Sequence, residues 1–294
     1  MVNTKIIIKI CTMKESSNMR VLVTGAKGQL GFDVIKSLKY NNITHLGIDK
    51  DELDITVESD VTKFVKEYQP TIIIHCAAYT AVDKAEEDKE LCHKINVLGT
   101  EYLAKAAKEV NSKFVYISTD YVFDGNGARF FTINDQPNPV NHYGETKYQG
   151  ELVVRSLLNE FYIIRISWVF GINGNNFVKT MLKLSEIREE INVVSDQIGS
   201  PTYTYDLSKA IVELIQTEKY GVHHITNDGV CSWNDFAKEI FRQANKQTIV
   251  HPILSKDYPT KAKRPLNSRL QKNYIQLRSW QEALAHFLKE YNDD

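Results

Sequence analysis

A phenol and an ammonium stand four residues apart in the segment Tyr143-Gly144-Glu145-Thr146-Lys147. The pattern from Tyr143 to Leu158 predicts a helix, and positions i and i+4 share one face of a helix. A lysine beside a tyrosine favours the phenolate, so we expect Lys147 to lower a phenol pKa that starts near ~10. Such a tyrosine can exchange a proton with an alcohol or ketone, as a carbonyl reductase requires. Many helices carry this spacing as a surface pair, so the rest of the chain must decide.

A glycine-rich loop follows the first predicted strand. Residues 20–24 form a short β-branched run, and residues 32–38 continue after the loop as an apolar-periodic helix. Between them the sequence reads Gly25-Ala26-Lys27-Gly28-Gln29-Leu30-Gly31. The order of strand, glycine turn and helix indicates a dinucleotide-binding fingerprint, because the glycines allow close backbone approach and the helix N-terminus offers N–H groups to a pyrophosphate. A merely flexible glycine loop is the alternative.

The second predicted strand, at 45–48, ends at Asp49 and Lys50. Asp49 lies 21 positions after Gly28, where an acid receives the hydroxyls of the adenosine ribose, and this favours NAD. Lys50, together with Lys27 of the glycine loop, could instead meet a 2′-phosphate. The sequence therefore predicts NADPH or NADH as cofactor and leaves the choice between them open.

Small and hydroxylated residues follow two further predicted strands. Cys76-Ala77-Ala78-Tyr79-Thr80 follows an apolar strand at 71–75, and its small side chains would let a flat ligand lie against the backbone. The strand at 113–117 ends in Ser118-Thr119-Asp120-Tyr121. Open α/β sheets bind ligands at the carboxyl ends of their strands. A Thr-Asp-Tyr turn is also ordinary cap chemistry, so this segment alone does not settle the function.

Strands and helices alternate from Val21 to Val169, which predicts an α/β fold with a doubly wound parallel sheet (Rossmann) and a smaller C-terminal substrate-binding portion. We expect residues 19–171 to form an NAD(P)-binding Rossmann domain. Residues 172–294 should form mainly the substrate-binding portion, with elements at about 201–227 returning to the Rossmann domain. We expect residues 1–18 to be an extension or disordered, and a short edge strand at 6–10 is the alternative.

The composition is that of an ordinary soluble protein: 43% of the 294 residues are hydrophobic and 25% are charged. The net charge of −1 argues against a general polyanion binder, so no nucleic-acid partner is expected. No apolar run approaches the ~18 residues of a membrane span, and the cysteines show no metal-type spacing. We therefore expect a cytoplasmic protein. A basic cluster (Lys256, Lys261, Lys263, Arg264, Arg269 and Lys272) is either a solvated face or a site for a ligand diphosphate.

Four features occur in a fixed order: the glycine loop at 25–31, Cys76-Ala77-Ala78, Ser118-Thr119-Asp120 and Tyr143-x-x-x-Lys147. This set resembles the extended short-chain dehydrogenase/reductase family over residues 19–290. Within that family the chain resembles the dTDP-4-dehydrorhamnose reductases at residues 28–31, 53–56, 77–83, 118–125 and 264–268. The resemblance implies an NAD(P)H-dependent oxidoreductase that converts dTDP-4-dehydro-L-rhamnose to dTDP-L-rhamnose, the last step of dTDP-rhamnose biosynthesis for cell-wall polysaccharide.

The resemblance also implies roles for individual residues. Tyr143 would donate a proton to the C4 oxygen of the sugar, Lys147 would hold the nicotinamide ribose, and Thr119 would hydrogen-bond the carbonyl; these three are the expected catalytic residues. The expected cofactor-binding residues are Gly25, Gly28, Gln29, Leu30, Gly31, Asp49, Lys50, Asp54, Ile55, Ala77, Ala78, Tyr79, Tyr143 and Lys147. The expected substrate-binding residues are Thr119, Asp120, Tyr121, Trp168 and Arg264.

Two rival functions remain open at this point. Sugar-nucleotide 4,6-dehydratases and epimerases share the scaffold, although the dehydratases resemble Thr-Asp-Glu where this chain has Tyr121. A regulatory subunit of methionine adenosyltransferase also resembles these reductases and acts by binding. Some reductases of the family are described as magnesium-linked dimers, but no residue pattern here carries over a magnesium site, and no metal ligand is predicted. The expected partners are a small nucleotide-sugar substrate and, beyond a monomer, a second copy in a homodimer.

Overall fold

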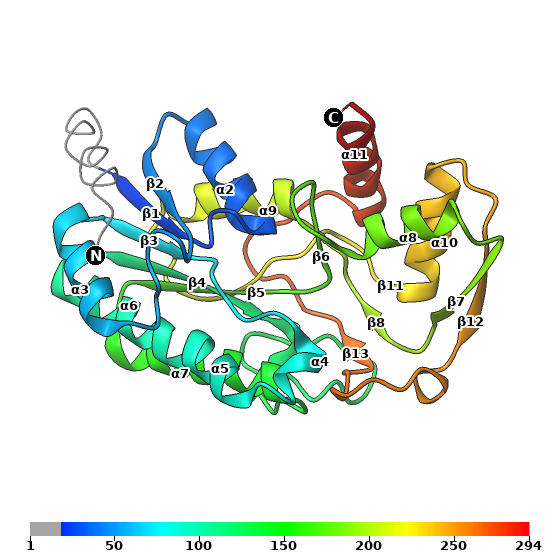
Figure 1. Cartoon of the computed structure of the whole chain (residues 1–294), viewed down its shortest axis with the longest axis horizontal. Helices are drawn as coiled ribbons and strands as arrows, with labels where there is room; N and C mark the ends of the chain where they lie inside the picture. The colour runs from blue at the N-terminus through cyan, green and yellow to red at the C-terminus, as the bar shows by residue number, and fades with distance from the viewer. Residues whose placement is uncertain (1–18, 294) are drawn as a thin grey trace.

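The computed structural model describes residues 19–293, so the expectations for residues 1–18 lie outside the described residues. A parallel sheet with helices on both faces carries a smaller portion at one end, near the carboxyl ends of the strands (Figure 1). The strands are β1 (Arg20–Thr24), β2 (Thr44–Ile48), β3 (Ile72–His75), β4 (Lys113–Thr119), β5 (Phe161–Ile166), β6 (Val169–Phe170), β7 (Glu190–Val194), β8 (Ile198–Gly199), β9 (Thr202–Tyr203), β10 (Gly221–His224), β11 (Cys231–Ser232), β12 (Ile249–Ile253) and β13 (Asn267–Ser268).

The longer helices cover the sheet or build the smaller portion. The α-helices are α2 (Gln29–Tyr40), α3 (Glu58–Tyr68), α4 (Val82–Ala85), α5 (Lys89–His93), α6 (Gly99–Glu109), α7 (His142–Leu157), α8 (Phe177–Ser185), α9 (Thr204–Leu214), α10 (Trp233–Gln243) and α11 (Trp280–Asp293). A π-helical turn at Lys94–Leu98 joins α5 to α6, and short 3₁₀ turns lie at Asp120–Val122 and Ser255–Asp257.

The main sheet has the strand order β10-β5-β4-β3-β1-β2, and every neighbouring pair is parallel. The chain runs from β1 outward to β2 and then crosses back to β3 on the other side of β1. This reversal places a crevice at the carboxyl ends of β1 and β3, where the predicted glycine loop and Cys76-Ala77-Ala78 begin. The predicted doubly wound parallel sheet is therefore confirmed.

Side chains of successive residues in the strands point to opposite faces, and each face has its own core. Leu22 of β1 packs with Phe64 of α3 and Leu103 of α6 on one face. Its neighbours Val21 and Val23 pack with α2 and α9 on the other face. The strands read as nearly continuous apolar runs because both of their faces are covered.

One strand and one helix from the second half of the chain, β10 and α9, pack with the Rossmann elements of the first half. β10 pairs in parallel with β5, and α9 packs against α2 beside it. The smaller portion has a core of its own around Phe236 and Phe287. It contains the β7–β12 pair and the small sheet β11-β8-β13. The division of the chain near residue 171 remains a proposal, with β10 and α9 as the elements that cross it.

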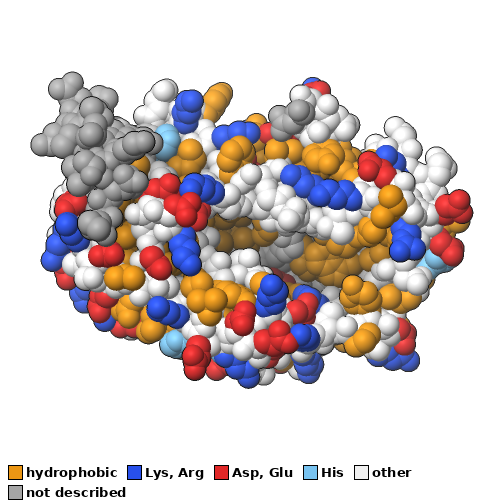
Figure 2. All heavy atoms as spheres, in the orientation of Figure 1, with side chains coloured by type: hydrophobic (Ala, Val, Ile, Leu, Met, Phe, Trp, Pro, Cys, Tyr) orange, Lys and Arg blue, Asp and Glu red, His pale blue; other side chains and the backbone are white. Residues whose placement is uncertain are grey.

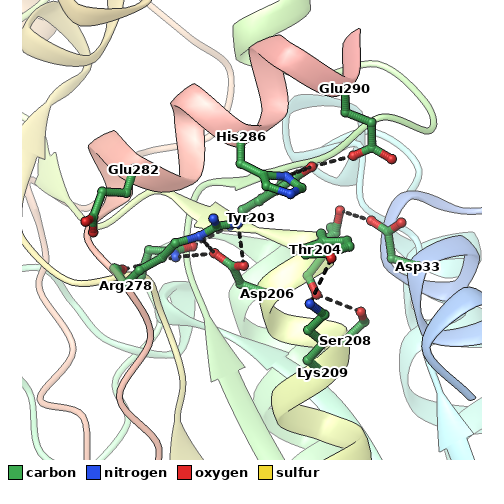
Figure 3. Close-up of polar contacts among 12 residues, drawn as sticks. Asp33, Tyr203, Thr204, Asp206, Ser208, Lys209, Arg278, Glu282, His286 and Glu290 are labelled. Atoms are coloured by element: carbon green, nitrogen blue, oxygen red, sulfur yellow. Dashed lines mark hydrogen bonds and ion pairs between the residues drawn. The ribbon is translucent and has the colours of Figure 1, made fainter. Parts of the chain in front are cut away.

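Polar contacts join the C-terminal helix α11 to β9, the segment before α11 to α9, and α9 to α2 (Figure 3). The Tyr203 hydroxyl donates to Oε2 of Glu290 over 2.6 Å. Arg278, just before α11, donates with two nitrogens to Asp206 of α9, over 2.8 and 2.7 Å. Thr204 donates to Asp33 of α2. These contacts join the smaller portion to the helix that begins at the glycine loop.

Candidate active site

A cleft of about 800 Å³ opens at the carboxyl ends of β1, β3 and β4. Residues of the glycine loop, the β3 end, the β4 end and α7 line it on one side, and Trp168 and Trp233 line it on the other. Figure 2 shows the hollow between the two portions of the molecule, with hydrophobic side chains gathered along the wall of the smaller portion. The cleft therefore unites segments that lie more than a hundred residues apart in the sequence.

The glycine loop brings backbone very close to backbone. Gly25 has a positive φ of 66°, and a Cβ there would lie 2.7 Å from the Ala77 nitrogen. A Cβ on Gly31 would lie 2.1 Å from the Gly25 carbonyl oxygen. α2 begins at Gln29 without a side-chain cap, so N–H groups of its first turn face the loop. These features fit a dinucleotide whose pyrophosphate lies at the helix N-terminus. Gly31 does not line the cleft, and its lack of a side chain lets α2 pack against Gly25.

Asp49 at the end of β2 fastens this loop. Its carboxylate accepts the backbone N–H of Lys27 over 3.1 Å and that of Lys50 over 2.8 Å. Lys27 turns its ammonium to Asp51, at 3.0 Å, and to Glu52, at 3.3 Å. Hydrogen bonding to these two carboxylates raises the pKa of Lys27. Asp49 and Lys50, the residues expected near the ribose, both line the cleft. Lys27, the other lysine expected near a 2′-phosphate, is paired with two acids instead.

The expected adenine and ribose contacts divide into two groups. Asp54, Ile55, Ala77 and Ala78 line the cleft. Tyr79 does not: its hydroxyl donates to Asp88 over 2.8 Å, at the surface, and its backbone N–H is held by Asn96. The Asp54 carboxylate caps its own turn by accepting from the N–H and hydroxyl of Thr56, and these bonds oppose the effect of burial and lower its pKa.

The helix α7 positions both Tyr143 and Lys147. It begins at His142, one residue before the predicted start, because the Asn141 side chain caps it by accepting the Gly144 N–H over 2.8 Å. A Cβ on Gly150 would lie 2.2 Å from the Tyr116 hydroxyl oxygen, so this glycine lets α7 lie directly on β4. Tyr143 and Lys147 both line the cleft, one helical turn apart.

The expected lowering of the Tyr143 pKa by Lys147 is not found in this structure. Burial raises the pKa of Tyr143, and the nearby Asp120 carboxylate raises it further. Burial also lowers the pKa of Lys147, to about 7, so the ammonium is only partly charged near neutral pH. Tyr143 is therefore held as a protonated phenol, which is the form that can donate a proton to a substrate oxygen.

Lys147 is 3% exposed, and its ammonium lies over the ring of Tyr116, 4.1 Å from the ring centre. The Tyr116 hydroxyl donates to the Lys147 carbonyl oxygen over 3.1 Å. The Lys147 side chain thus packs on the Tyr116 ring and still forms part of the cleft wall.

Thr119 and Asp120 form the end of β4. The Thr119 hydroxyl donates to Oδ1 of Asp120 over 3.0 Å and accepts the Tyr121 N–H over 3.2 Å. Oδ2 of Asp120 is buried without a hydrogen-bond partner, and burial raises the pKa of Asp120 to about 6. Both residues line the cleft beside Tyr143, as the sequence predicted.

Tyr121 lines the cleft next to Tyr143, and Arg264 contacts Tyr121. The Tyr121 ring meets the Tyr143 ring edge-on, with centroids 5.9 Å apart. Arg264 donates to the Tyr121 hydroxyl over 3.3 Å and pairs with Asp83 at 2.6 Å. Arg264 is outside the cleft lining and contacts it through Tyr121. Two other members of the basic cluster are also paired with acids, Lys261 with Glu87 and Lys272 with Asp228.

Two residues of the site were missed in the sequence. Asn96, in the π-helical turn, is buried; it donates to Thr146 of α7 over 3.0 Å and accepts the Tyr79 N–H over 2.8 Å. Trp233 stacks on Trp168 with ring centroids 3.7 Å apart. Trp168 has a positive φ of 49°, and a Cβ on Gly199 would lie 2.6 Å from its ring. The pairing of Trp168 with Trp233 has no local signal in the sequence, whereas a lone asparagine in an apolar helix could have marked Asn96.

Residues 19–293 contain no group of three or more His, Cys, Asp or Glu side chains arranged to hold a metal ion. Over the same residues, none of the helices combines the length and apolar character that a membrane span requires.

Known proteins resemble this chain over almost its whole length. A family described as the RmlD substrate binding domain matches residues 19–293. A crystal structure of dTDP-4-dehydrorhamnose reductase from Bacillus anthracis in complex with NADP is 46% identical, with a TM-score of 0.91, and the match covers 93% of this chain and 100% of that one. A reductase structure from Clostridium acetobutylicum is 43% identical, with a TM-score of 0.91 and the same coverage. The reductase of Aggregatibacter actinomycetemcomitans is 42% identical over 91% of this chain and 97% of its own length. The resemblance predicted from the motifs is thus confirmed, and the chain belongs to the RmlD substrate-binding domain family.

Proposed function

We propose that this protein reduces dTDP-4-dehydro-L-rhamnose to dTDP-L-rhamnose with NADPH or NADH. The observation that carries the proposal is the meeting of Tyr143, Lys147 and Thr119 in one cleft beside a glycine loop shaped for a dinucleotide. The similarity to proteins named dTDP-4-dehydrorhamnose reductase supports the choice of substrate. In this proposal the dinucleotide lies along residues 19–171 and the nucleotide sugar extends toward residues 172–293.

The residues around Tyr143 supply the acid chemistry of the reduction. The nicotinamide, when bound, supplies the hydride. Tyr143 donates its proton to the carbonyl oxygen of the sugar as negative charge develops there. The Lys147 ammonium stabilises the tyrosinate that remains, because an opposite charge one helical turn away favours the ionised phenol. Thr119 can donate to the same carbonyl oxygen when its hydroxyl turns away from Asp120.

The side chain after Asp120 argues against dehydration. The 4,6-dehydratases resemble this chain but have a glutamate where it has Tyr121. The Tyr121 side chain is half-buried, and burial raises the pKa of its phenol. It cannot replace a carboxylate base near neutral pH. The complete set of Thr119, Tyr143 and Lys147 also favours an enzyme over a regulatory subunit that acts only by binding.

The proposal is tested by mixing the purified protein with dTDP-4-dehydro-L-rhamnose and NADPH or NADH. We expect loss of the reduced-nicotinamide absorbance and formation of dTDP-L-rhamnose in equal amounts. The same sugar on another nucleotide tests whether the dTDP moiety is required. Binding of the nucleotide sugar without any turnover would contradict the proposal and favour a binding role.

A further inference from the structure

Glu151 is a fully buried carboxylate of α7, one helical turn beyond Lys147. Its Oε1 accepts the Ser118 hydroxyl over 2.6 Å and Nε of Arg165 over 2.8 Å. Its Oε2 accepts Nη2 of Arg165 over 2.7 Å. Arg165, on β5, is also fully buried. Neither Glu151 nor Arg165 lines the cleft, whereas Lys147 and Ser118 do. Any effect of Glu151 on the reaction must therefore pass through these two neighbours.

The first route is electrostatic. Four other titratable groups face Lys147 from neighbouring elements: His75 of β3, Cys76 after it, Cys92 of α5 and Tyr116 of β4. Burial lowers the pKa of His75 to about 3, raises the pKa of Cys76 to about 12, and raises the pKa values of Cys92 and Tyr116.

All four groups are therefore neutral near pH 7. Burial disfavours the Lys147 ammonium, and the leading effect that opposes it is the charge of Glu151. On the same helix, Tyr143 is a protonated phenol and adds no charge in the resting site. The charged state of Lys147 thus depends mainly on one buried carboxylate.

The second route is mechanical. Ser118 directly precedes Thr119 in β4, and its hydroxyl is held by Glu151. Arg165 holds the same carboxylate from β5, two residues before Ser167 and three before Trp168 at the cleft. One side chain of α7 is thereby tied to the ends of two strands, β4 and β5, that carry residues of the cleft wall.

We propose that Glu151 is a positioning residue for the reduction, which keeps Lys147 charged and, through Ser118, fixes the strand end that carries Thr119. This inference rests on the proposed function for its kinetic consequences, but the state of Lys147 can be measured without substrate.

Three variants separate the two routes. Glu151→Gln removes the charge but leaves Arg165 buried without its partner, so it risks failing to fold. The double variant Glu151→Gln with Arg165→Met removes the whole pair, so that Arg165 is not left buried without its partner. Ser118→Ala removes only the bond to the strand end. The matched control is Asp206→Asn with Arg278→Met, since that pair has the same two-nitrogen geometry but lies beside α11 (Figure 3).

The decisive readout is the titration midpoint of Lys147, followed by NMR of lysine-labelled protein alone and assigned with Lys147→Met. We expect a midpoint near pH 7 in the wild type. In the double variant we expect a fall of about one pH unit, less than in Glu151→Gln, because the loss of the Arg165 charge acts in the opposite direction. At pH 8 its kcat/KM should then fall about tenfold, since the charged fraction of Lys147 falls tenfold. Ser118→Ala should lower kcat and leave the midpoint unchanged, and the control should change neither.

An unchanged Lys147 midpoint in the double variant would overturn the electrostatic route, and wild-type kcat in Ser118→Ala would overturn the mechanical route. If the wild-type protein reduces no nucleotide sugar, the proposed function fails, whereas the midpoint still decides whether Glu151 keeps Lys147 charged.

Discussion

The protonation state of Tyr143 is set by burial and by neighbouring side chains rather than by its spacing from Lys147 in the helix. Burial and Asp120 keep its phenol protonated, so it is prepared to act as an acid in the reductive direction. In the proposed mechanism the charge that stabilises the tyrosinate comes from Lys147, whose own ammonium is disfavoured by burial. The sequence shows the Tyr-x-x-x-Lys spacing but not the burial of both groups, and burial reverses the expected direction of the tyrosine pKa.

Replacing Tyr143 with phenylalanine tests its role as proton donor. The ring keeps its packing area, so affinity for the nicotinamide cofactor should change little, while turnover should fall by about 10²- to 10⁴-fold through loss of the general acid. Steady-state kinetics and cofactor binding by calorimetry give the two quantities. Tyr148→Phe, on the same helix, is the control and should retain wild-type turnover. A Tyr143→Phe protein with normal turnover would remove Tyr143 from the mechanism.

Lys27 provides a test of cofactor selectivity. Its ammonium is paired with Asp51 and Glu52, so it is not free to meet a 2′-phosphate. Asp51→Asn with Glu52→Gln should release it and raise the ratio of kcat/KM for NADPH over NADH by roughly fivefold, the upper range for exposed pairs. Binding of NADP⁺ and NAD⁺ by calorimetry should shift in the same sense. Asp49→Ala also favours NADPH by removing a negative charge, but it detaches the Lys27 backbone as well. An unchanged ratio in the Asp51 and Glu52 variant would show that Lys27 does not reach the ribose.

At the scale of elements, the contact of α7 with β4 sets the depth of Tyr143 and Lys147 in the cleft wall. The contact depends on Gly150, whose Cβ position is occupied by the Tyr116 hydroxyl, 2.2 Å away. Strand β4 runs to Thr119, two residues beyond the predicted end, and its last residues lie in the cleft.

Gly150→Ala should push α7 away from β4. We expect a loss of about 1–3 kcal/mol in the free energy of unfolding, as for other additions to a packed core, together with reduced turnover. Gln149→Ala is the control, because the Gln149 amide contacts the exposed Glu145 at 3.4 Å and its replacement by alanine favours the helix. Denaturant unfolding of the two variants gives the difference. Equal stability would mean that Tyr116 can move aside without cost.

The main-sheet strands and their helices were predictable because each has a strong local pattern. Arg20–Thr24 begins and ends as predicted, and the boundaries of the other predicted strands differ by one or two residues. The two-residue strands β6, β8, β9, β11 and β13 were not predictable, because their pairing partners are distant in the sequence. The π-helical turn at Lys94–Leu98 has no separate signal in the sequence, and its wider turn brings Asn96 to Thr146 and Tyr79. The stacking of Trp168 on Trp233 likewise arises only when the two portions meet.

At the scale of the whole molecule, buried histidines link stability to pH. Burial lowers the pKa of His75 to about 3, whereas an unfolded histidine titrates near ~6.5. Between about pH 3 and 6.5, therefore, the unfolded chain binds a proton at His75 and the folded protein does not. The contribution of His75 to stability is fully present above about pH 6.5 and is lost as the pH falls toward 3, by up to ~1.4 kcal/mol per pH unit.

His75→Gln removes this titration while offering hydrogen bonds to Thr24 and Thr100, the partners of the histidine. We expect the variant to be less stable at neutral pH but to lose less stability between pH 6 and 4.5, by about 2 kcal/mol over that interval. Urea unfolding at several pH values measures both slopes. Parallel curves for His75→Gln and wild type would exclude His75 as a source of acid sensitivity.

The pairing of β10 with β5 and the packing of α9 on α2 limit how this protein can be recombined with its relatives. A fragment ended at residue 171 would leave β5 as an uncovered edge and would expose the apolar side of α2, so we expect it to aggregate rather than fold. A chimaera that exchanges the smaller portion alone would need one splice after β5, another before α9 and a third after β10. Specificity in this family is therefore easier to transfer in discontinuous pieces than as a single block of sequence.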